Sequence, residues 1–201
     1  MILPNQLTVL RIILTPIFLV LFLSDDPTLK QISFVVYFIA AITDWYDGWL
    51  ARKFNYITAW GKFLDPLADK ILTSAAFFAF VFLGVLDLWM VLVIVIRDFL
   101  ITGLRALSEY RKQYFTTSYL AKWKTMLQML LINYLLVIYI LRTVPYLNEN
   151  YKYIFDILLD EKLTYFAMLL ITGLTLITGI SYIYKNWNLI KRLIQVETDE
   201  N

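Results

Sequence analysis

The chain contains neither cysteine nor histidine among its 201 residues. The absence of cysteine excludes disulfides, thiolate metal sites and a cysteine nucleophile. The absence of histidine excludes imidazole as a general base or a metal ligand. Catalysis by this chain must therefore use carboxylates, lysine, arginine, hydroxyl groups or a bound metal ion. A long run of lysine and arginine is also absent and the net charge is only +2, so we expect no nucleic acid partner.

Apolar residues make up 60% of the chain, more than a soluble domain of this length requires. Six apolar segments approach the length at which a helix crosses about 30 Å of hydrocarbon. Five of them lie at about 7–23, 62–86, 88–107, 121–141 and 163–184. The remaining segment, second in the chain, starts near residue 32 and must continue past residue 43 into the aspartates to be long enough. The first segment lacks the basic start of a cleavable signal peptide, so we expect it to be retained. We predict an all-α integral membrane protein of six transmembrane helices, formed by one domain over residues 1–201.

Lysine and arginine are divided unevenly between the two sides of the predicted membrane domain. With six spans, both termini share a side with the second–third and fourth–fifth connections. Thirteen basic residues fall on that side and four on the other. Basic residues concentrate in the cytoplasmic loops of membrane proteins. We therefore place both termini in the cytoplasm and expect a multi-pass protein of a bacterial cell (cytoplasmic) membrane.

Four aspartates interrupt the apolar sequence in two groups, DWYDGWLAR from Asp44 and, eight residues later, GKFLDPLAD ending at Asp69. Asp44 and Asp47 are three residues apart, and Asp65 and Asp69 four, so each pair shares one helical face. Such like charges in a poorly solvated site cannot all ionise without partners. Carboxylates without histidine or cysteine favour Mg²⁺ or Mn²⁺. The predicted topology puts both groups in the cytoplasmic leaflet, where we expect a metal site.

The same segment contains residues suited to phosphoryl transfer, in which two metal ions stabilise the attacking and leaving oxygens. Gly48, one turn after Asp44, leaves room for a ligand to approach the helix. The guanidinium of Arg52 suits a phosphate group. Asp69 lies deepest on its helix, where a carboxylate can act as general base towards an attacking hydroxyl. The segment is therefore a candidate active site that opens towards the cytoplasm.

The pattern Asp-x2-Asp-Gly-x2-Ala-Arg-x8-Gly-x3-Asp-x3-Asp, over residues 44–69, resembles the full signature of the CDP-alcohol phosphotransferase family. The resemblance implies a homodimer that binds a cytidine diphosphate-linked lipid through two ions, Mg²⁺ or Mn²⁺, and releases CMP when an alcohol attacks. The metal ligands that it implies are Asp44, Asp47, Asp65 and Asp69, with Asp69 also the general base. The Asn5-x2-Thr8-x2-Arg11 start resembles the first helix of the family. The contacts that the resemblance implies for the CDP-lipid are Asn5, Thr8, Gly48, Arg52 and Thr58.

Residues 97–128 are predicted to form the acceptor region. The strings Arg97-Asp98, TGLR ending at Arg105, and KWKT from Lys122 to Thr125, followed by Gln128, resemble the phosphatidylglycerophosphate synthase branch of the family. That branch transfers a phosphatidyl group from CDP-diacylglycerol to sn-glycerol 3-phosphate, giving phosphatidylglycerophosphate and CMP. The acceptor phosphate requires a basic pocket, and the candidates by position are Arg105, Arg111, Lys122 and Lys124. Asp98 is spaced to orient Arg105 along the same helical face.

Two alternatives stay open. Within the family, the acceptor could instead be inositol phosphate, serine or phosphatidylglycerol. In a different class, the carboxylates could belong to a metal-ion transporter, because charged groups within a membrane also mark ion pathways. Arg97 is expected near mid-membrane, where it needs either a carboxylate partner or the substrate. We expect Asn133 to form an interhelical hydrogen bond and Gly173 and Gly179 to allow close helix packing.

Overall fold

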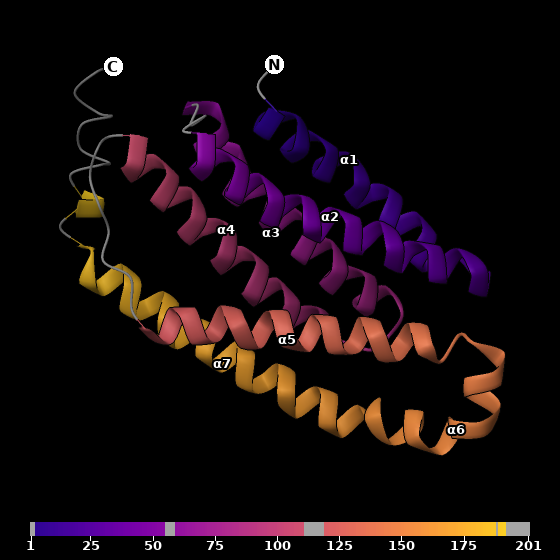
Figure 1. Ribbon diagram of the computed structural model, residues 1–201. Helices are drawn as coiled ribbons and strands as arrows, with labels where there is room; N and C mark the ends of the chain where they lie inside the picture. The colour runs from indigo at the N-terminus through magenta and orange to yellow at the C-terminus, as the bar shows by residue number, and fades with distance from the viewer. Residues whose placement is uncertain (1–2, 55–58, 111–118, 188, 192–201) are drawn as a thin grey trace.

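The computed structural model describes residues 3–54, 59–110, 119–187 and 189–191, with backbone alone at 3–5, 44–45, 47–54, 59–64 and 109–110. This part of the chain is helical and contains no strand (Figure 1). The helices are α1 (Leu3–Leu23), α2 (Pro27–Phe54), α3 (Ala59–Phe82), α4 (Leu88–Tyr110), α5 (Tyr119–Leu141), α6 (Pro145–Leu158) and α7 (Glu161–Lys185). The predicted all-α class is confirmed.

Three of these helices are long and apolar enough to cross a membrane, namely α1 from Gln6 onwards, α5 and α7. The other three long helices, α2, α3 and α4, fall where the second to fourth spans are predicted. They also contain the charged residues of the candidate site, the aspartates on α2 and α3 and the Arg97-Asp98 pair on α4. The number of crossings therefore stays a prediction at six.

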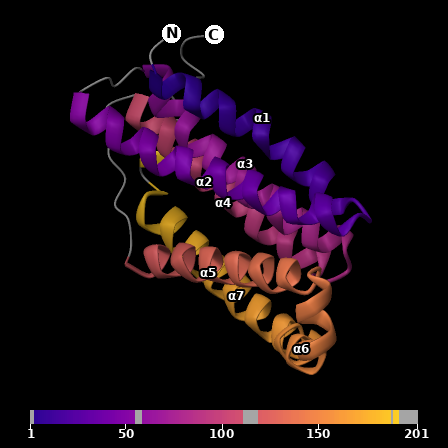
Figure 2. The same ribbon diagram turned by 45° about the vertical axis from the view of Figure 1, so that its right-hand side comes forward.

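A short helix that the apolar segments do not indicate, α6, lies between the fifth and sixth predicted spans. It has 14 residues, begins with Pro145 and is kinked at Tyr151, where φ is −126° and ψ is 22°. A proline at the first helical position costs no hydrogen bond, because that N–H has no partner within the helix. At about 1.5 Å per residue, α6 is too short to cross a bilayer. It joins α5 to α7 at one end of the molecule (Figure 2).

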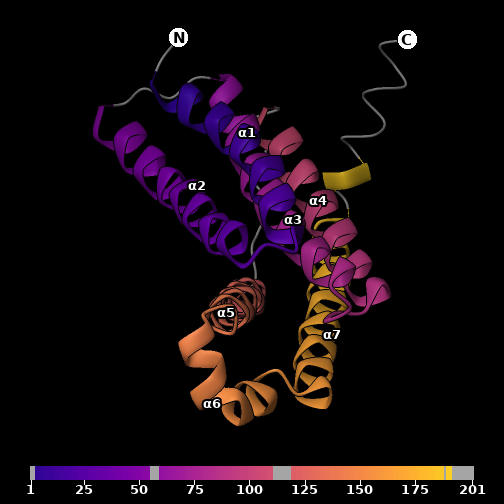
Figure 3. The same ribbon diagram turned by 90° about the vertical axis from the view of Figure 1, so that its right-hand side faces the viewer.

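Helices α1 to α4 run alongside one another, and α5 crosses them steeply. Figure 3 shows α5 nearly end-on, whereas α1 and α2 run across the picture. Helix α1 packs against α2 and α3, and α4 packs against both α3 and α7. Because successive helices of the first four reverse direction, the start of α1, the end of α2, the start of α3 and the end of α4 meet at one end (Figure 1). The aspartate segment lies at that end.

An aromatic cluster fixes the opposite end of the same helices. Phe22 of α1 lies 5.4 Å from Phe18 and 5.3 Å from Phe80 of α3, measured between ring centroids. Phe80 in turn meets the ring of Tyr139 of α5 edge-on at 5.9 Å. Such aromatic pairs stabilise packing beyond the area that they bury. The cluster therefore holds α1, α3 and α5 together and sets the register at which their polar ends face one another.

The turns and polar side chains inside the bundle have local explanations. Gly84, with φ of 71°, reverses the chain between α3 and α4 in a backbone region that favours glycine. Asp160 caps α7 by accepting hydrogen bonds from the backbone N–H groups of Lys162 and Leu163. Asn133 donates to the carbonyl of Met129 at 2.7 Å within its own helix. The predicted interhelical hydrogen bond of Asn133 is therefore wrong, because the side chain faces outwards and its own helix supplies the acceptor.

Candidate active site

The candidate site is built on the end of α2 and the start of α3. The backbone of Asp44, Asp47, Gly48 and Arg52 lies in α2, and that of Asp65 and Asp69 in α3. Several predicted contacts lie outside the described residues or side chains, and they stay predictions. These are the side chains of Asn5, Asp44, Asp47 and Arg52, the surroundings of Gly48, and the whole of residues Thr58 and Arg111.

Asp65 and Asp69 lie one turn apart on α3, as their spacing predicts, and both side chains are partly exposed. Helix α3 begins at Ala59, so Pro66 falls inside the helix and not in its first turn. The helix continues through the proline, although the missing N–H removes one backbone hydrogen bond. The two carboxylates therefore keep one helical face in common.

Helix α1 contributes a buried polar residue to the aspartate segment. The hydroxyl of Thr8 donates a hydrogen bond of 2.5 Å to Oδ1 of Asp65, 57 residues further along the chain. Thr8 is 1% exposed, and Arg11, one turn later on α1, is fully buried. Thr8 thus lies against Asp65, a predicted metal ligand. The CDP-lipid is predicted to bind in the same segment. Its role towards a ligand stays a prediction.

A second group of charges lies beside the first and joins three helices. The carboxylate of Asp98 on α4 is 2.6 Å from Lys124 Nζ of α5, 3.1 Å from Arg97 Nη1 and 3.7 Å from Lys70 Nζ of α3. We call these four residues, Lys70, Arg97, Asp98 and Lys124, the Asp98 cluster. Of the two partners expected for Arg97, a carboxylate or the substrate, the structure shows a carboxylate, that of Asp98. The predicted pairing of Asp98 with Arg105 is wrong, because the described partners of Asp98 are the other three cations.

The Asp98 cluster is also attached to α7. Nη2 of Arg97 donates a hydrogen bond of 3.1 Å to the hydroxyl of Thr178. A Cβ at Gly179 would lie 3.1 Å from Cγ of Arg97, closer than nearly all such contacts. Glycine at 179 therefore makes room for the arginine, and the predicted close packing is confirmed there. It is wrong for Gly173, where a Cβ would meet nothing within 4 Å.

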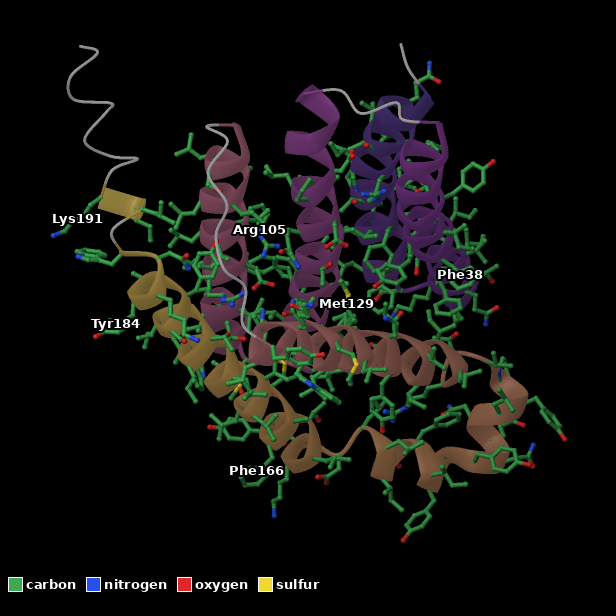
Figure 4. All side chains as sticks on the ribbon, turned by 60° about the vertical axis from the view of Figure 1, so that its left-hand side comes forward. Phe38, Arg105, Met129, Phe166, Tyr184 and Lys191 are labelled. Carbon is green, nitrogen blue, oxygen red and sulfur yellow. The ribbon has the colours of Figure 1, made fainter. Side chains whose placement is uncertain are left out.

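Two of the predicted acceptor residues, Lys122 and Lys124, have different surroundings on α5. Lys124 is fully buried and bound to Asp98, whereas Lys122, two positions earlier on α5, is exposed and lies 5.5 Å from the ring centroid of Tyr119. Residues two apart on a helix point to nearly opposite faces. Arg105 is exposed on α4 (Figure 4). The structure thus brings Lys124, and not Lys122, to the Asp98 cluster.

Lys70 is the residue of this region that sequence reasoning misses. Its Nζ lies 3.6 Å from Oδ2 of Asp69 and 3.7 Å from Oδ2 of Asp98, so it bridges the two charged groups. The only signal in the sequence is its position directly after the last aspartate of the signature. Because a basic residue there also fits a cytoplasmic helix end, that signal alone does not indicate a site.

The donor chemistry of the aspartate segment fits a divalent metal ion. Asp65 and Asp69 present carboxylate oxygens on one face, and Asp65 keeps an oxygen free of its bond to Thr8. Such hard oxygen donors suit Mg²⁺ and Mn²⁺. Within the described residues, no three acidic side chains converge as metal ligands. The predicted set needs Asp44 and Asp47 as well, and their side chains lie outside that part of the structure.

Comparison with known proteins defines the class. Residues 1–190 match the family model of the CDP-alcohol phosphatidyltransferases, so the chain belongs to that family and is an enzyme, a transferase of phospholipid biosynthesis. The family generally uses divalent metals.

Three curated relatives share the name CDP-diacylglycerol–glycerol-3-phosphate 3-phosphatidyltransferase. The one from Bacillus subtilis (strain 168) is 35% identical over 201 residues, covering 94% of this chain and 97% of the relative. The one from Rickettsia bellii (strain RML369-C) is 34% identical over 180 residues, covering 90% and 92%. The one from Salmonella typhimurium (strain LT2) is 38% identical over 138 residues, covering 66% and 75%. The family signature read from residues 44–69 is thus matched by a relationship that extends along most of the chain.

Proposed function

We propose that this enzyme transfers a phosphatidyl group from CDP-diacylglycerol to sn-glycerol 3-phosphate, giving phosphatidylglycerophosphate and CMP. The observation that carries the proposal is the contact between the two charged groups, in which Lys70 lies between Asp69 and Asp98. A site for an anionic acceptor needs positive charge next to the base, and this contact supplies it. The names of the three relatives support the same reaction.

The aspartate segment would hold two ions, Mg²⁺ or Mn²⁺, through Asp44, Asp47, Asp65 and Asp69. When bound, these ions neutralise the diphosphate of the CDP-lipid and stabilise charge on the leaving group. The residues for the CDP-lipid are Asn5, Thr8, Gly48, Arg52 and Thr58. The bond from Thr8 to Asp65 supports this division, because it holds the polar face of α1 against the helix that provides two of the carboxylates.

The reaction needs one proton transfer and one displacement. Asp69 accepts the proton of the acceptor hydroxyl, and the hydroxyl oxygen attacks the phosphorus that bears the diacylglycerol. The bond from that phosphorus to the oxygen bridging to CMP breaks, and CMP leaves with that oxygen and its electron pair. Asp69 is suited to this role because its side chain is 32% exposed and borders Lys70 on the side of α4.

We place the site at the cytoplasmic leaflet of a cell membrane, in a homodimer whose protomers each cross the membrane six times with both termini inside. The arrangement of the helices supports an even number of crossings. The start of α1 and the end of α7 lie away from the end of the molecule that α6 occupies (Figures 1 and 2). A cytoplasmic site would receive a lipid substrate from the leaflet and a soluble acceptor from water.

The acceptor is tested directly by a panel of alcohols. Purified protein would be given CDP-diacylglycerol, Mg²⁺ and in turn glycerol 3-phosphate, inositol phosphate, serine and phosphatidylglycerol, while CMP release is followed. We expect rapid release with glycerol 3-phosphate and background release with the others. Faster release with another alcohol would replace the acceptor proposed here. Chelation of the metal should abolish release in every case, and added Mg²⁺ or Mn²⁺ should restore it.

A further inference from the structure

Lys70 has an ammonium group with unused hydrogen-bonding capacity. Its two carboxylate neighbours, on Asp69 and Asp98, lie 3.6 and 3.7 Å away. Both distances exceed the range of about 2.7–3.2 Å for a hydrogen bond from nitrogen to oxygen. Among the described residues, Lys70 therefore has ion pairs but donates no hydrogen bond. An ammonium carries three N–H donors, and this one is largely buried yet still reached by solvent, with 14% of the side chain exposed.

The other cations of the Asp98 cluster are bound more tightly. Lys124 donates to Asp98 Oδ1 at 2.6 Å, and Arg97 donates to the same oxygen at 3.1 Å and to Thr178. Lys124 and Arg97 thus both donate to Oδ1 of Asp98, whereas Lys70 lies nearest to Oδ2. Lys124 is fully enclosed. Of the three cations, Lys70 is the one whose donors remain open and whose side chain borders the general base.

The charges of this region do not cancel. Lys70, Arg97 and Lys124 contribute three positive charges, and the carboxylates within 4 Å of them in the described structure, Asp69 and Asp98, contribute two negative ones. A net positive charge in a poorly solvated interior is costly unless an anion compensates it. If Asp69 also binds a metal ion, the excess is larger. The region is therefore prepared for an anionic ligand.

We propose that Lys70 binds the phosphate of the acceptor alcohol and that Asp98 is the positioning residue that holds Lys70 in place. The proposal rests on the transfer reaction proposed above and specifies the chemical class of its acceptor, an alcohol that carries a phosphomonoester. An N–H of Lys70 that donates to the phosphate places the acceptor beside Asp69, the neighbouring residue that takes the hydroxyl proton. Lys124 and Arg97 hold Asp98 through Oδ1 and leave Oδ2 to face Lys70.

The positions of the helices agree with this assignment. Asp98 is attached to α5 through Lys124 and to α7 through its neighbour Arg97, so its carboxylate cannot follow Lys70 if that side chain moves. In Figure 4, α5, labelled at Met129, passes below α3 and α4, and Arg105 lies above it on α4. Arg105 is seven residues after Asp98 and so shares its side of α4.

The direct test is Lys70→Met, compared with Lys152→Met as a matched control that removes an exposed lysine from α6. Initial rates of CMP release would be measured against glycerol 3-phosphate and, separately, against CDP-diacylglycerol. Loss of a hydrogen bond to a charged group should raise the KM for glycerol 3-phosphate about tenfold or more. The KM for CDP-diacylglycerol should stay within about twofold of the wild-type value, and the Tm should stay within a few degrees of the wild-type Tm. The control variant should show the same two results. An unchanged KM for glycerol 3-phosphate, or an equal rise in both KM values, would overturn the assignment.

A second pair of variants tests the positioning role of Asp98. Asp98→Asn should raise the KM for glycerol 3-phosphate. Asp98→Glu should raise that KM less, because a longer carboxylate still reaches Lys70. A role in folding alone would lower the Tm and the amount of active enzyme while leaving the KM for glycerol 3-phosphate unchanged, which would overturn the positioning role. If the wild-type enzyme released no CMP with glycerol 3-phosphate, the proposed function itself would fail. If the wild type is active and Lys70→Met matches it, only the present inference fails.

Discussion

The ammonium of Lys124 lies 2.6 Å from Oδ1 of Asp98, with the lysine fully buried and the aspartate side chain 4% exposed. This pair joins α5 to α4 across a separation of 26 residues, and both members belong to the predicted acceptor region, residues 97–128. Its two members differ in their remaining partners. Asp98 also has Arg97 and Lys70, whereas the described partner of Lys124 is Asp98 alone. Removing one or the other therefore has different consequences.

We predict that Asp98→Asn destabilises the enzyme more than Lys124→Met does. The first change leaves three cations without their shared carboxylate, and breaking a buried pair in this way costs about 3–5 kcal/mol. The second change leaves Asp98 with two cations and puts an apolar side chain in the enclosed space. Unfolding of the purified variants in one detergent, followed by circular dichroism, measures the difference.

The exposed ion pair between Arg142 and Asp156, at 3.0 Å, is the matched control for that comparison. Exposed pairs contribute about 0–1 kcal/mol, so Asp156→Asn should leave the unfolding transition nearly unchanged. If Asp98→Asn and Asp156→Asn lowered the free energy of unfolding equally, the claim that the buried Asp98 cluster stabilises the enzyme would be contradicted.

Gly179 and Gly173 provide a second paired prediction, on helix packing. Gly179→Val places atoms against Cγ of Arg97, which Thr178 and Asp98 hold in position, so the Tm should fall by several degrees. Gly173→Val enters open space and should leave the Tm unchanged or raise it, because glycine is a poor helix former. Thermal unfolding of both variants in the same lipid mixture measures the contrast, and a larger loss at Gly173 would be inconsistent with this packing.

Thr8→Val tests whether the contact between α1 and Asp65 serves the CDP-lipid. Valine keeps the shape of threonine but loses the hydrogen bond of 2.5 Å. A bond to a carboxylate contributes about 1.5–3 kcal/mol, so kcat/KM for CDP-diacylglycerol should fall about tenfold or more. Thr15→Val is the control, since Thr15 is also buried on α1 but donates only to the carbonyl of Arg11 in its own helix. Equal values of kcat/KM for the two variants would show that Thr8 has no role in binding CDP-diacylglycerol.

Asp69→Asn tests the assignment of the base. The amide cannot accept the hydroxyl proton, and loss of a general base reduces kcat by about 10²–10⁴-fold. Binding of CDP-diacylglycerol, measured by equilibrium titration in the presence of Mg²⁺, should weaken much less. Turnover near the wild-type rate would assign the proton transfer to another group.

The helices and the aspartate segment could be predicted from sequence because both depend on local spacing. Apolar length indicates a membrane helix, and intervals of three and four residues place Asp44 with Asp47 and Asp65 with Asp69 on shared faces. The resemblance to the first helix of the family predicts Thr8 as a contact of the CDP-lipid, which stays a prediction, and the structure places its hydroxyl on Asp65. These features need no knowledge of how one helix is rotated against another.

The Asp98 cluster could not be predicted in the same way, because it depends on the rotation of α5 and the depth of α4. Lys122 and Lys124 are equivalent by composition, and only the packed face of α5 decides that Lys124 is buried. Lys70 and Asp98 are 28 positions apart, and their contact follows from the packing of α3 against α4. Asn133 shows the same dependence on helix rotation. A polar residue in an apolar helix is expected at a helix interface, but the rotation of α5 points Asn133 outwards, and it donates to the carbonyl of Met129 in its own helix.

The central claim, phosphatidyl transfer to glycerol 3-phosphate, is tested most directly by following the acceptor into lipid. Isotopically labelled glycerol 3-phosphate would be incubated with the enzyme, CDP-diacylglycerol and Mg²⁺, and label in the organic phase would be compared with CMP in the aqueous phase. The account predicts one labelled phosphatidylglycerophosphate for each CMP, and a rate of formation about 10²–10⁴-fold lower for both products with Asp69→Asn. CMP formed without labelled lipid would contradict it.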